Sequence, residues 1–247
     1  MSRLVALFTL LQASPAMTQS PPGAHSYPFR VGETFEYVGK LGLLTLGSAS
    51  MSVTGLDTVR GVETFVFRFA LKASTIVFKM DDVMLSWAST ADLNSRRFHT
   101  DFDEGGEIRR RYYEIYPDSA MFTERVRSER GVSVPDPLDD AAFFYFVRTL
   151  PLEVGRTYSF DRYFRKNKNP VTIEVQKRES CDLPNDQKAT CLVLHPVVNA
   201  DRNGMFSPRA DAQIWLTDDS RRIIAQVRSR LSFGTVTLRL RTLQLGR

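Results

Sequence analysis

The sequence predicts a mainly β protein: a single antiparallel meander sheet that curls into an open or closed barrel, with one short aromatic helix. Three observations predict this fold. From Gly32 onward, apolar and polar residues alternate with a period of two, which is typical of strands with one buried face and one wet face. Strand-like segments recur roughly every ten residues, and turn-forming residues separate most of them. This spacing favours hairpins over βαβ units.

The first sixteen residues are typical of a signal peptide. Arg3 precedes the apolar run Leu4–Leu11, which is too short to span a bilayer. Small residues in Ala13–Ala16 suit cleavage after Ala16, and no cysteine follows there that would accept a lipid anchor. We therefore expect residues 1–16 to be removed and the chain to be periplasmic. The alternative, a buried first strand at Leu4–Leu11, is disfavoured by the polar and proline-rich residues that follow.

Length and composition favour one sizeable domain after the leader. We expect residues 17–29 to form a flexible mature N-terminus and residues 30–247 a single β-rich domain without a transmembrane segment. A content of 43% apolar residues can fill a large core. The 33 Lys and Arg residues exceed the 28 Asp and Glu residues by only five, so we expect no nucleic-acid partner. The oligomeric state is left open.

The alternation predicts a chain of strands interrupted by one helix. The predicted strands are one that begins at Phe35, then Leu43–Val53, Phe65–Leu71, Ile76–Met80, Met84–Thr90, Arg96–Asp103, Glu107–Tyr116, Ala120–Ser128, Thr157–Arg165, Val171–Arg178, Leu192–Val198, Ala210–Thr217, Ile223–Phe233 and Thr235–Leu243. Small residues around Gly47 indicate a bend or bulge. An acidic cap at Asp139-Asp140 and a stop at Pro151 predict the helix. Its four consecutive aromatic residues, 143–146, leave no polar face there, so it should be buried on more than one side.

The two cysteines, Cys181 and Cys191, flank a turn-forming stretch between two strand-like segments. Their α-carbons can therefore come within bridging distance across a hairpin. We expect a structural disulfide, because two cysteines make an incomplete zinc site and a catalytic pair is more typically C-x-x-C.

Several motifs occur in an order that resembles a known family. These motifs are Gly32–Tyr37, the small-residue strand around Gly47, the Asp139-Asp140 helix leading to Leu152–Gly155, and Trp215–Arg222. The chain resembles domain-of-unknown-function family 3108 of bacterial envelope proteins, over roughly Val31 to Leu243. The resemblance implies a periplasmic β-rich fold, and it implies no established activity and no catalytic residues.

Candidate catalytic and metal-binding residues each have a simpler interpretation. His99, Asp101 and Asp103 share one face of a strand and suit a divalent cation, but the wet side of a sheet gives the same pattern. The acidic pair Asp139-Asp140 suits a helix cap, and a second pair, Asp218-Asp219, suits a hairpin turn. A third acidic pair, at residues 81–82, lies on a predicted strand where adjacent side chains point to opposite faces. No nucleophile elbow, phosphate-binding loop or H-E-x-x-H motif occurs. We expect no enzymatic activity, no cofactor and no metal.

The arginine run Arg109-Arg110-Arg111 lies beside two tyrosines. It suits either a basic surface for anionic headgroups or polymers, or a solvated edge that discourages aggregation of sheets. We take the second interpretation as the simpler one.

A surplus of aromatic residues suggests a hydrophobic ligand. A sheet that curls round an aromatic helix is lipocalin-like or lipoprotein-carrier-like, which is an analogy of architecture only. The leading hypothesis is a non-enzymatic protein that binds or carries a hydrophobic or amphipathic ligand such as a lipid; the same residues would otherwise fill a solid core. The predicted cavity-lining residues are Phe65, Phe67, Phe69, Trp87, Phe143, Phe144, Phe146 and Trp215. The alternative is a structural or assembly factor of the cell envelope that uses an arginine-rich outer face, Arg228, Arg230, Arg239 and Arg241; a hydrolase is the third and weakest hypothesis.

Overall fold

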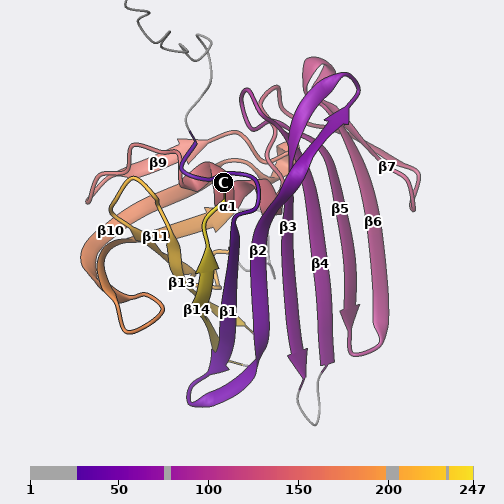
Figure 1. The fold of residues 1–247 in the computed structure, drawn as a ribbon. Helices are drawn as coiled ribbons and strands as arrows, with labels where there is room; N and C mark the ends of the chain where they lie inside the picture. Colours follow the sequence, from indigo (N-terminus) through magenta and orange to yellow (C-terminus); the bar gives the residue numbers. More distant parts are fainter. Residues whose placement is uncertain (1–26, 75–78, 199–205, 232–233, 247) are drawn as a thin grey trace, which may run out of the picture.

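The computed structural model describes residues 27–74, 79–198, 206–231 and 234–246, which form one fourteen-stranded antiparallel sheet and one α-helix (Figure 1). The strands are β1 (Thr34–Leu41), β2 (Leu44–Val59), β3 (Val62–Ser74), β4 (Lys79–Ser89), β5 (Ser95–Glu104), β6 (Glu107–Tyr116), β7 (Met121–Glu124), β8 (Glu129–Val132), β9 (Thr157–Phe160), β10 (Val171–Asp182), β11 (Lys188–Val198), β12 (Gln213–Thr217), β13 (Ile224–Leu231) and β14 (Gly234–Gln244). Short 3₁₀ turns lie at Pro117–Ser119 and Lys166–Lys168. The predicted leader lies outside the described residues.

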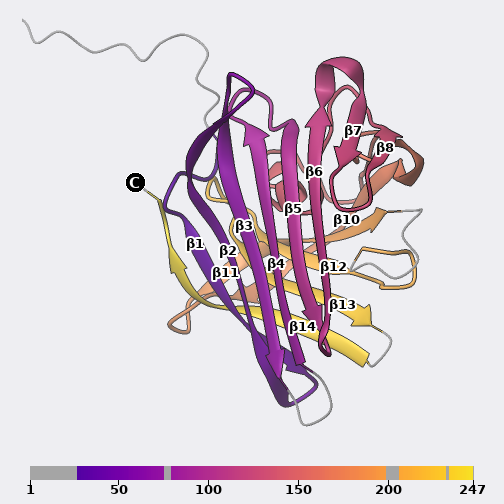
Figure 2. The ribbon, with the colours of Figure 1, turned by 90° about the vertical axis from the view of Figure 1, so that its right-hand side faces the viewer.

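The strands follow one another as a meander, and the first strand of the sequence pairs with the last. Strand β1 pairs with β2 on one side and with β14 on the other, so the order is β8 to β1 and then β14 to β9. The halves β1–β8 and β9–β14 curl over each other and cross at a steep angle (Figure 2). Strands β8 and β9 are the two edges, and no ladder joins them in the described part of the chain. In the described residues the sheet is therefore not closed by hydrogen bonds.

The predicted helix is α1 (Asp140–Val147), which lies between the two halves of the sheet. The Asp139 side chain caps it by accepting hydrogen bonds from the Ala141 and Ala142 amides at 3.0 and 2.9 Å. All seven residues from Ala141 to Val147 are buried. A helix without a polar face is stable only when apolar surfaces cover it on several sides, and the curled sheet provides them.

A disulfide joins Cys181 at the end of β10 to Cys191 in β11, with 5.8 Å between the α-carbons. The predicted bridge is confirmed. The bridge links the two strands of the β10–β11 hairpin. The turn of this hairpin contains Asn185 and Asp186, both of which have positive φ.

The expected irregularity near Gly47 is confirmed. The pairing of β1 with β2 shifts register between Gly39 and Lys40, next to the Gly39–Gly47 pair. A β-carbon at Gly47 would lie 1.8 Å from the Lys72 carbonyl oxygen of β3, so only glycine permits the strands to approach this closely. The close approach and the shift together bend the hairpin at the end where β1 turns into β2.

Some boundaries differ from the predictions. A single strand, β4, replaces the two expected at Ile76–Met80 and Met84–Thr90, and residues 75–78 lie outside the described residues. The short edge strand β8 was not predicted. The expected flexible segment 17–29 is wrong at its end, because Phe29 is 4% exposed and packs against the rings of Phe65, Phe67 and Tyr145.

One buried arginine ties three distant parts of the chain together. Arg148, at the C-terminal end of α1, donates to both carboxylate oxygens of Glu33 at 2.5 and 3.0 Å. It also donates to the carbonyl oxygens of Pro28, Arg221 and Arg222. The rings around its guanidinium are those of Phe29, Phe35 and Tyr145. The N-terminal segment, the helix and the β12–β13 turn therefore share one ion pair that solvent does not reach.

Candidate functional site

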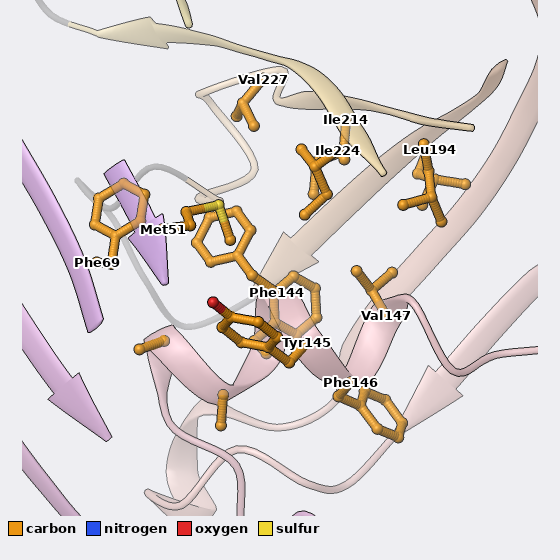
Figure 3. Close-up of a cluster of buried hydrophobic side chains, with 14 of the residues drawn as sticks. Met51, Phe69, Phe144, Tyr145, Phe146, Val147, Leu194, Ile214, Ile224 and Val227 are labelled. Carbon is orange, nitrogen blue, oxygen red and sulfur yellow. The ribbon is translucent and has the colours of Figure 1, made fainter. Parts of the chain in front are cut away.

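The inner, concave face of the sheet has a sealed end around α1. There the Phe67 and Tyr145 rings stack 3.8 Å apart, and the Phe69 and Phe144 rings stack 5.5 Å apart. Figure 3 shows the helix side chains pointing at both halves of the sheet, with Phe144 and Tyr145 toward Met51 and Phe69. Further rings continue the packing: Phe65, Phe143, Phe146, Phe160 and Phe206.

The six predicted phenylalanines are thus brought together, and they fill the space between them. The cavity beside Phe143, Phe146, Phe160 and Phe206 has a volume of about 20 Å³. This is room for about one water molecule, whereas small-molecule sites occupy roughly 300–1,000 Å³. Among the described residues the sealed end is therefore packed as core, and this cavity has no room for an acyl chain.

The two predicted tryptophans lie on the opposite, outer face. Trp87 donates its indole NH to Asp57 at 2.9 Å, and Trp215 donates to Glu179 at 2.7 Å. The Arg97 guanidinium lies over the Trp87 ring. Their strand neighbours Ser86, Ala88, Ile214 and Leu216 are buried inside instead. The prediction that both tryptophans line the cavity is therefore corrected: they pack on the outside of the sheet.

The outer face also carries the predicted histidine cluster and the arginine-rich surface. His99 packs between Trp87 and Tyr112 at 4.8 Å from each ring, and burial followed by the nearby Arg97 lowers its pKa. Asp101 pairs with Arg110 at 3.0 Å. No group of three potential metal ligands occurs among the described residues. Of the four outer arginines, Arg228 lies over Trp215 and Arg230 lies 3.8 Å from Asp211, whereas Arg239 and Arg241 are exposed.

An open groove of about 590 Å³ runs past the C-terminal end of α1 and the β12–β13 turn. Its charged groups form ion pairs: Arg148 with Glu33, Asp218 with Arg178 at 2.7 Å, and Arg222 with Asp218 at 3.5 Å, although Arg222 Nη1 makes no hydrogen bond with a described residue. Asp219 accepts from the amides of Arg221 and Arg222, as a turn residue does. These pairings favour a structural role for the groove.

The other end of the concave face, away from α1, carries described apolar residues that do not belong to the core cluster. Met80 and Phe102 are half-buried on the inner side of β4 and β5, and neither packs against the core cluster. Leu41 of β1 and its cross-strand partner Val236 of β14 are also half-buried on the inner face, and they too lie outside the core cluster. The core around α1 does not need these side chains.

Charged residues lie on the same inner positions. Alternation from buried Tyr113 places Arg111 and Arg109 inside, and Arg109 pairs with Glu104 of β5. Asp82 is the cross-strand partner of Phe102. We call this set the open end: Leu41, Met80, Asp82, Phe102, Arg109, Arg111 and Val236.

Asp82 is the most unusual group of the open end. One of its carboxylate oxygens is buried and has no hydrogen-bond partner in the described part of the chain. Burial raises the pKa of Asp82 from 3.8 to about 6; the Asp103 amide and Arg109 oppose this rise, and Asp81 adds to it. Asp82 lies four residues before Ser86 on β4. Because Ser86 contacts the helix cap, Asp82 lies about 13 Å further from the cap along the strand. A buried carboxylate oxygen without a partner calls for an explanation, and a ligand group that donates a hydrogen bond to it is one.

Sequence reasoning missed the open end for an identifiable reason. The sequence alone presents Asp82 only as half of an acidic pair, and Arg109 and Arg111 only as part of an arginine run. The signal that identifies them is register: Asp82 is opposite Phe102, which is opposite Arg109. The expected roles of the other acidic pairs agree with the structure, since Asp139 is the helix cap and Asp218 begins the β12–β13 turn.

The chain matches the family described as "Protein of unknown function (DUF3108)" over residues 36–241. The chain belongs to this family. The resemblance inferred from the sequence is thereby confirmed. No curated protein matches the sequence of this DUF3108 protein.

Solved structures resemble its fold. A beta-barrel-like protein of domain of unknown function DUF1849 from Brucella abortus has a TM-score of 0.55 at 11% identity, with 88% of this chain and 98% of that chain covered. A candidate lipoprotein from Parabacteroides distasonis shares 9% identity over 88% of this chain and 98% of that chain, at a TM-score of only 0.30. The first comparison supports the barrel-like fold. No helix in the described ranges has the length and apolar character needed to cross a membrane.

Proposed function

We propose that this DUF3108 protein binds an amphipathic ligand, such as a lipid, in the open end of its concave face, and that it does so without catalysing a reaction. The observation that carries the proposal is the composition of this surface. Half-buried Met80 and Phe102 lie outside the core cluster, next to Asp82, whose carboxylate has a buried oxygen without a partner. Ligand sites typically combine such apolar walls with a few polar groups that orient the ligand.

The charges of the open end favour a ligand with a polar head. Arg109 and Arg111 are on the inner side of β6, and the side chain of Arg109 is 50% exposed. The sealed end limits how far an apolar chain can enter, because the rings around α1 pack against one another and the cavity beside Phe143 and Phe146 holds only about 20 Å³. The ligand's apolar part would therefore lie between β4–β5 and the β1–β14 pair, with its head near the arginines.

The proposal is tested by titrating the purified mature chain with a fluorescent fatty acid. Phe102→Ala should weaken binding at least tenfold, because the ring would be a direct wall of the site, while stability changes little because the ring is outside the core. The matched control is Leu85→Ala, a half-buried leucine on the outer face of β4. Equal affinity of Phe102→Ala, Leu85→Ala and the wild type would exclude the open end as the binding site.

We also propose that the protein acts in the periplasm after removal of residues 1–16. The supporting feature is the leader-like sequence that ends at Ala16. N-terminal sequencing of protein recovered from the periplasmic fraction should begin at Met17. Recovery of the chain in the cytoplasm with Met1 or Ser2 at its terminus would contradict this.

A further inference from the structure

The most exposed large apolar side chain of the described residues is at a turn. Leu43 is 98% exposed and Leu44 is 68% exposed, where β1 turns into β2. Gly42 supplies the positive φ of +59° that the tight turn requires. Hairpin turns usually carry Gly, Asn, Asp or Ser at such positions, and two adjacent leucines at the tip have no role in the core.

A second apolar side chain lies at the same end of the molecule. Ile108, next to the β5–β6 turn, is 59% exposed. Figures 1 and 2 both place the β1–β2 and β5–β6 turns at one end, away from α1. We call Leu43, Leu44 and Ile108 the apolar rim. It borders the open end, because Leu41 directly precedes the β1–β2 turn and Arg109 lies two residues beyond the first residue of β6.

Two lysines accompany the rim. Lys40 is the next-to-last residue of β1, two residues before Gly42, and Lys79 begins β4. Neither lysine forms an ion pair with another described residue. A lysine can lay its methylene stem along apolar surface and extend its ammonium group to a phosphate. Leucines at a convex tip with lysines behind them match the order of layers in a bilayer surface, with apolar chains deeper than phosphates.

We propose that the apolar rim inserts into the surface of a phospholipid bilayer and so places the open end against lipid. The shape of the rim selects this partner. A projecting tip enters a fluid lipid surface without a preformed socket, whereas a second copy of the chain would need an apolar groove to receive it. The large groove near α1 is polar and already ion-paired. This inference rests on the proposed function in one respect: docking would bring the open end to its ligand only if the open end binds lipid. The docking itself can be measured separately.

The test is flotation of the mature chain with vesicles of phosphatidylcholine alone and with one-fifth phosphatidylglycerol. The wild type should float with both and slightly more with the anionic vesicles. Leu43→Ser/Leu44→Ser should reduce partitioning at least tenfold on both, because two leucines leave the lipid. Leu56→Ser is the matched control, since Leu56 is 51% exposed near the far end of β2. Equal partitioning of the double variant and the wild type, or binding of the wild type that 0.5 M salt abolishes, would overturn the proposal.

Solution titration separates this inference from the proposed function. Leu43→Ser/Leu44→Ser should bind a monomeric fluorescent fatty acid as the wild type does, because the tip is outside the ligand site. If Phe102→Ala leaves fatty-acid binding intact while the leucine variant loses the vesicles, the docking stands and the ligand site is wrong. If the leucine variant floats normally while Phe102→Ala loses the fatty acid, the ligand site stands and the docking is wrong.

Discussion

Replacing Arg148 with methionine should remove a large share of the stability of the fold. The side chains of Arg148 and Glu33 are 0% and 2% exposed, so Arg148→Met leaves a carboxylate buried without its cation. The carbonyl oxygens of Pro28, Arg221 and Arg222 also lose a donor. Removing one partner of a buried ion pair typically destabilises by roughly 3–5 kcal/mol, out of a total of about 5–15 kcal/mol for a domain. We expect a loss of about 4 kcal/mol.

Urea unfolding followed by far-UV circular dichroism measures this loss. Arg241→Met, an exposed arginine of β14, is the control and should change the unfolding free energy by less than about 0.5 kcal/mol. In the double variant Glu33→Met/Arg148→Met, much of the stability should return, because no charge remains buried. A loss below about 1 kcal/mol for Arg148→Met, or two fully additive substitutions, would refute the role assigned to this ion pair.

Three further predictions follow from the packing and the pKa shifts. Because the pKa of Asp82 is raised, the folded state binds its proton more tightly and stability falls as pH rises from about 4 through 6. Asp82→Asn should therefore match the wild type at pH 4 and exceed it at pH 8 by about 1 kcal/mol, after allowance for solvent screening of a half-exposed group, and urea titrations at both pH values measure the difference. Cys181→Ser/Cys191→Ser should lower the unfolding free energy by about 3 kcal/mol, and reduction of the wild type should do the same. Phe144→Ala, in the sealed end, should lose about 3–5 kcal/mol in the same assay, so a loss under 1 kcal/mol would show that the end is hollow.

Much of the fold can be predicted because strand alternation is local. In β3, β6 and β13 the period of two reflects which side chains face the core. The helix can be predicted from the Asp139 cap and the apolar residues that follow it. The open barrel cannot be predicted this way. Whether β8 meets β9 depends on how far the sheet curls, which is set by register between strands as distant as β1 and β14.

The tryptophans show why the face of a strand can be misassigned. On β4 the largest apolar residue, Trp87, was expected inside, but the helix cap approaches so closely that Ser86 hydrogen-bonds to Asp139 at 2.6 Å. Only small residues such as Ser86 and Ala88 fit beneath α1, so the ring lies outside. On β12, Ile214 and Leu216 already fill the inner positions. Residue size therefore predicted the wrong face, because a long-range contact decides which side has room.

The pairing of β1 with β14 has a consequence for how the chain is assembled. Thr34 lies opposite Gln244, so β1 keeps one unpaired edge until the final strand has been synthesised. A ribosome-bound or truncated chain that lacks β14 would present this edge to other molecules, and full-length chains should fold slowly because the decisive contact spans nearly the whole domain. The same adjacency makes the protein suited to circular permutation: a short linker can join the two ends, and new termini can open between β8 and β9, where the sheet is already interrupted.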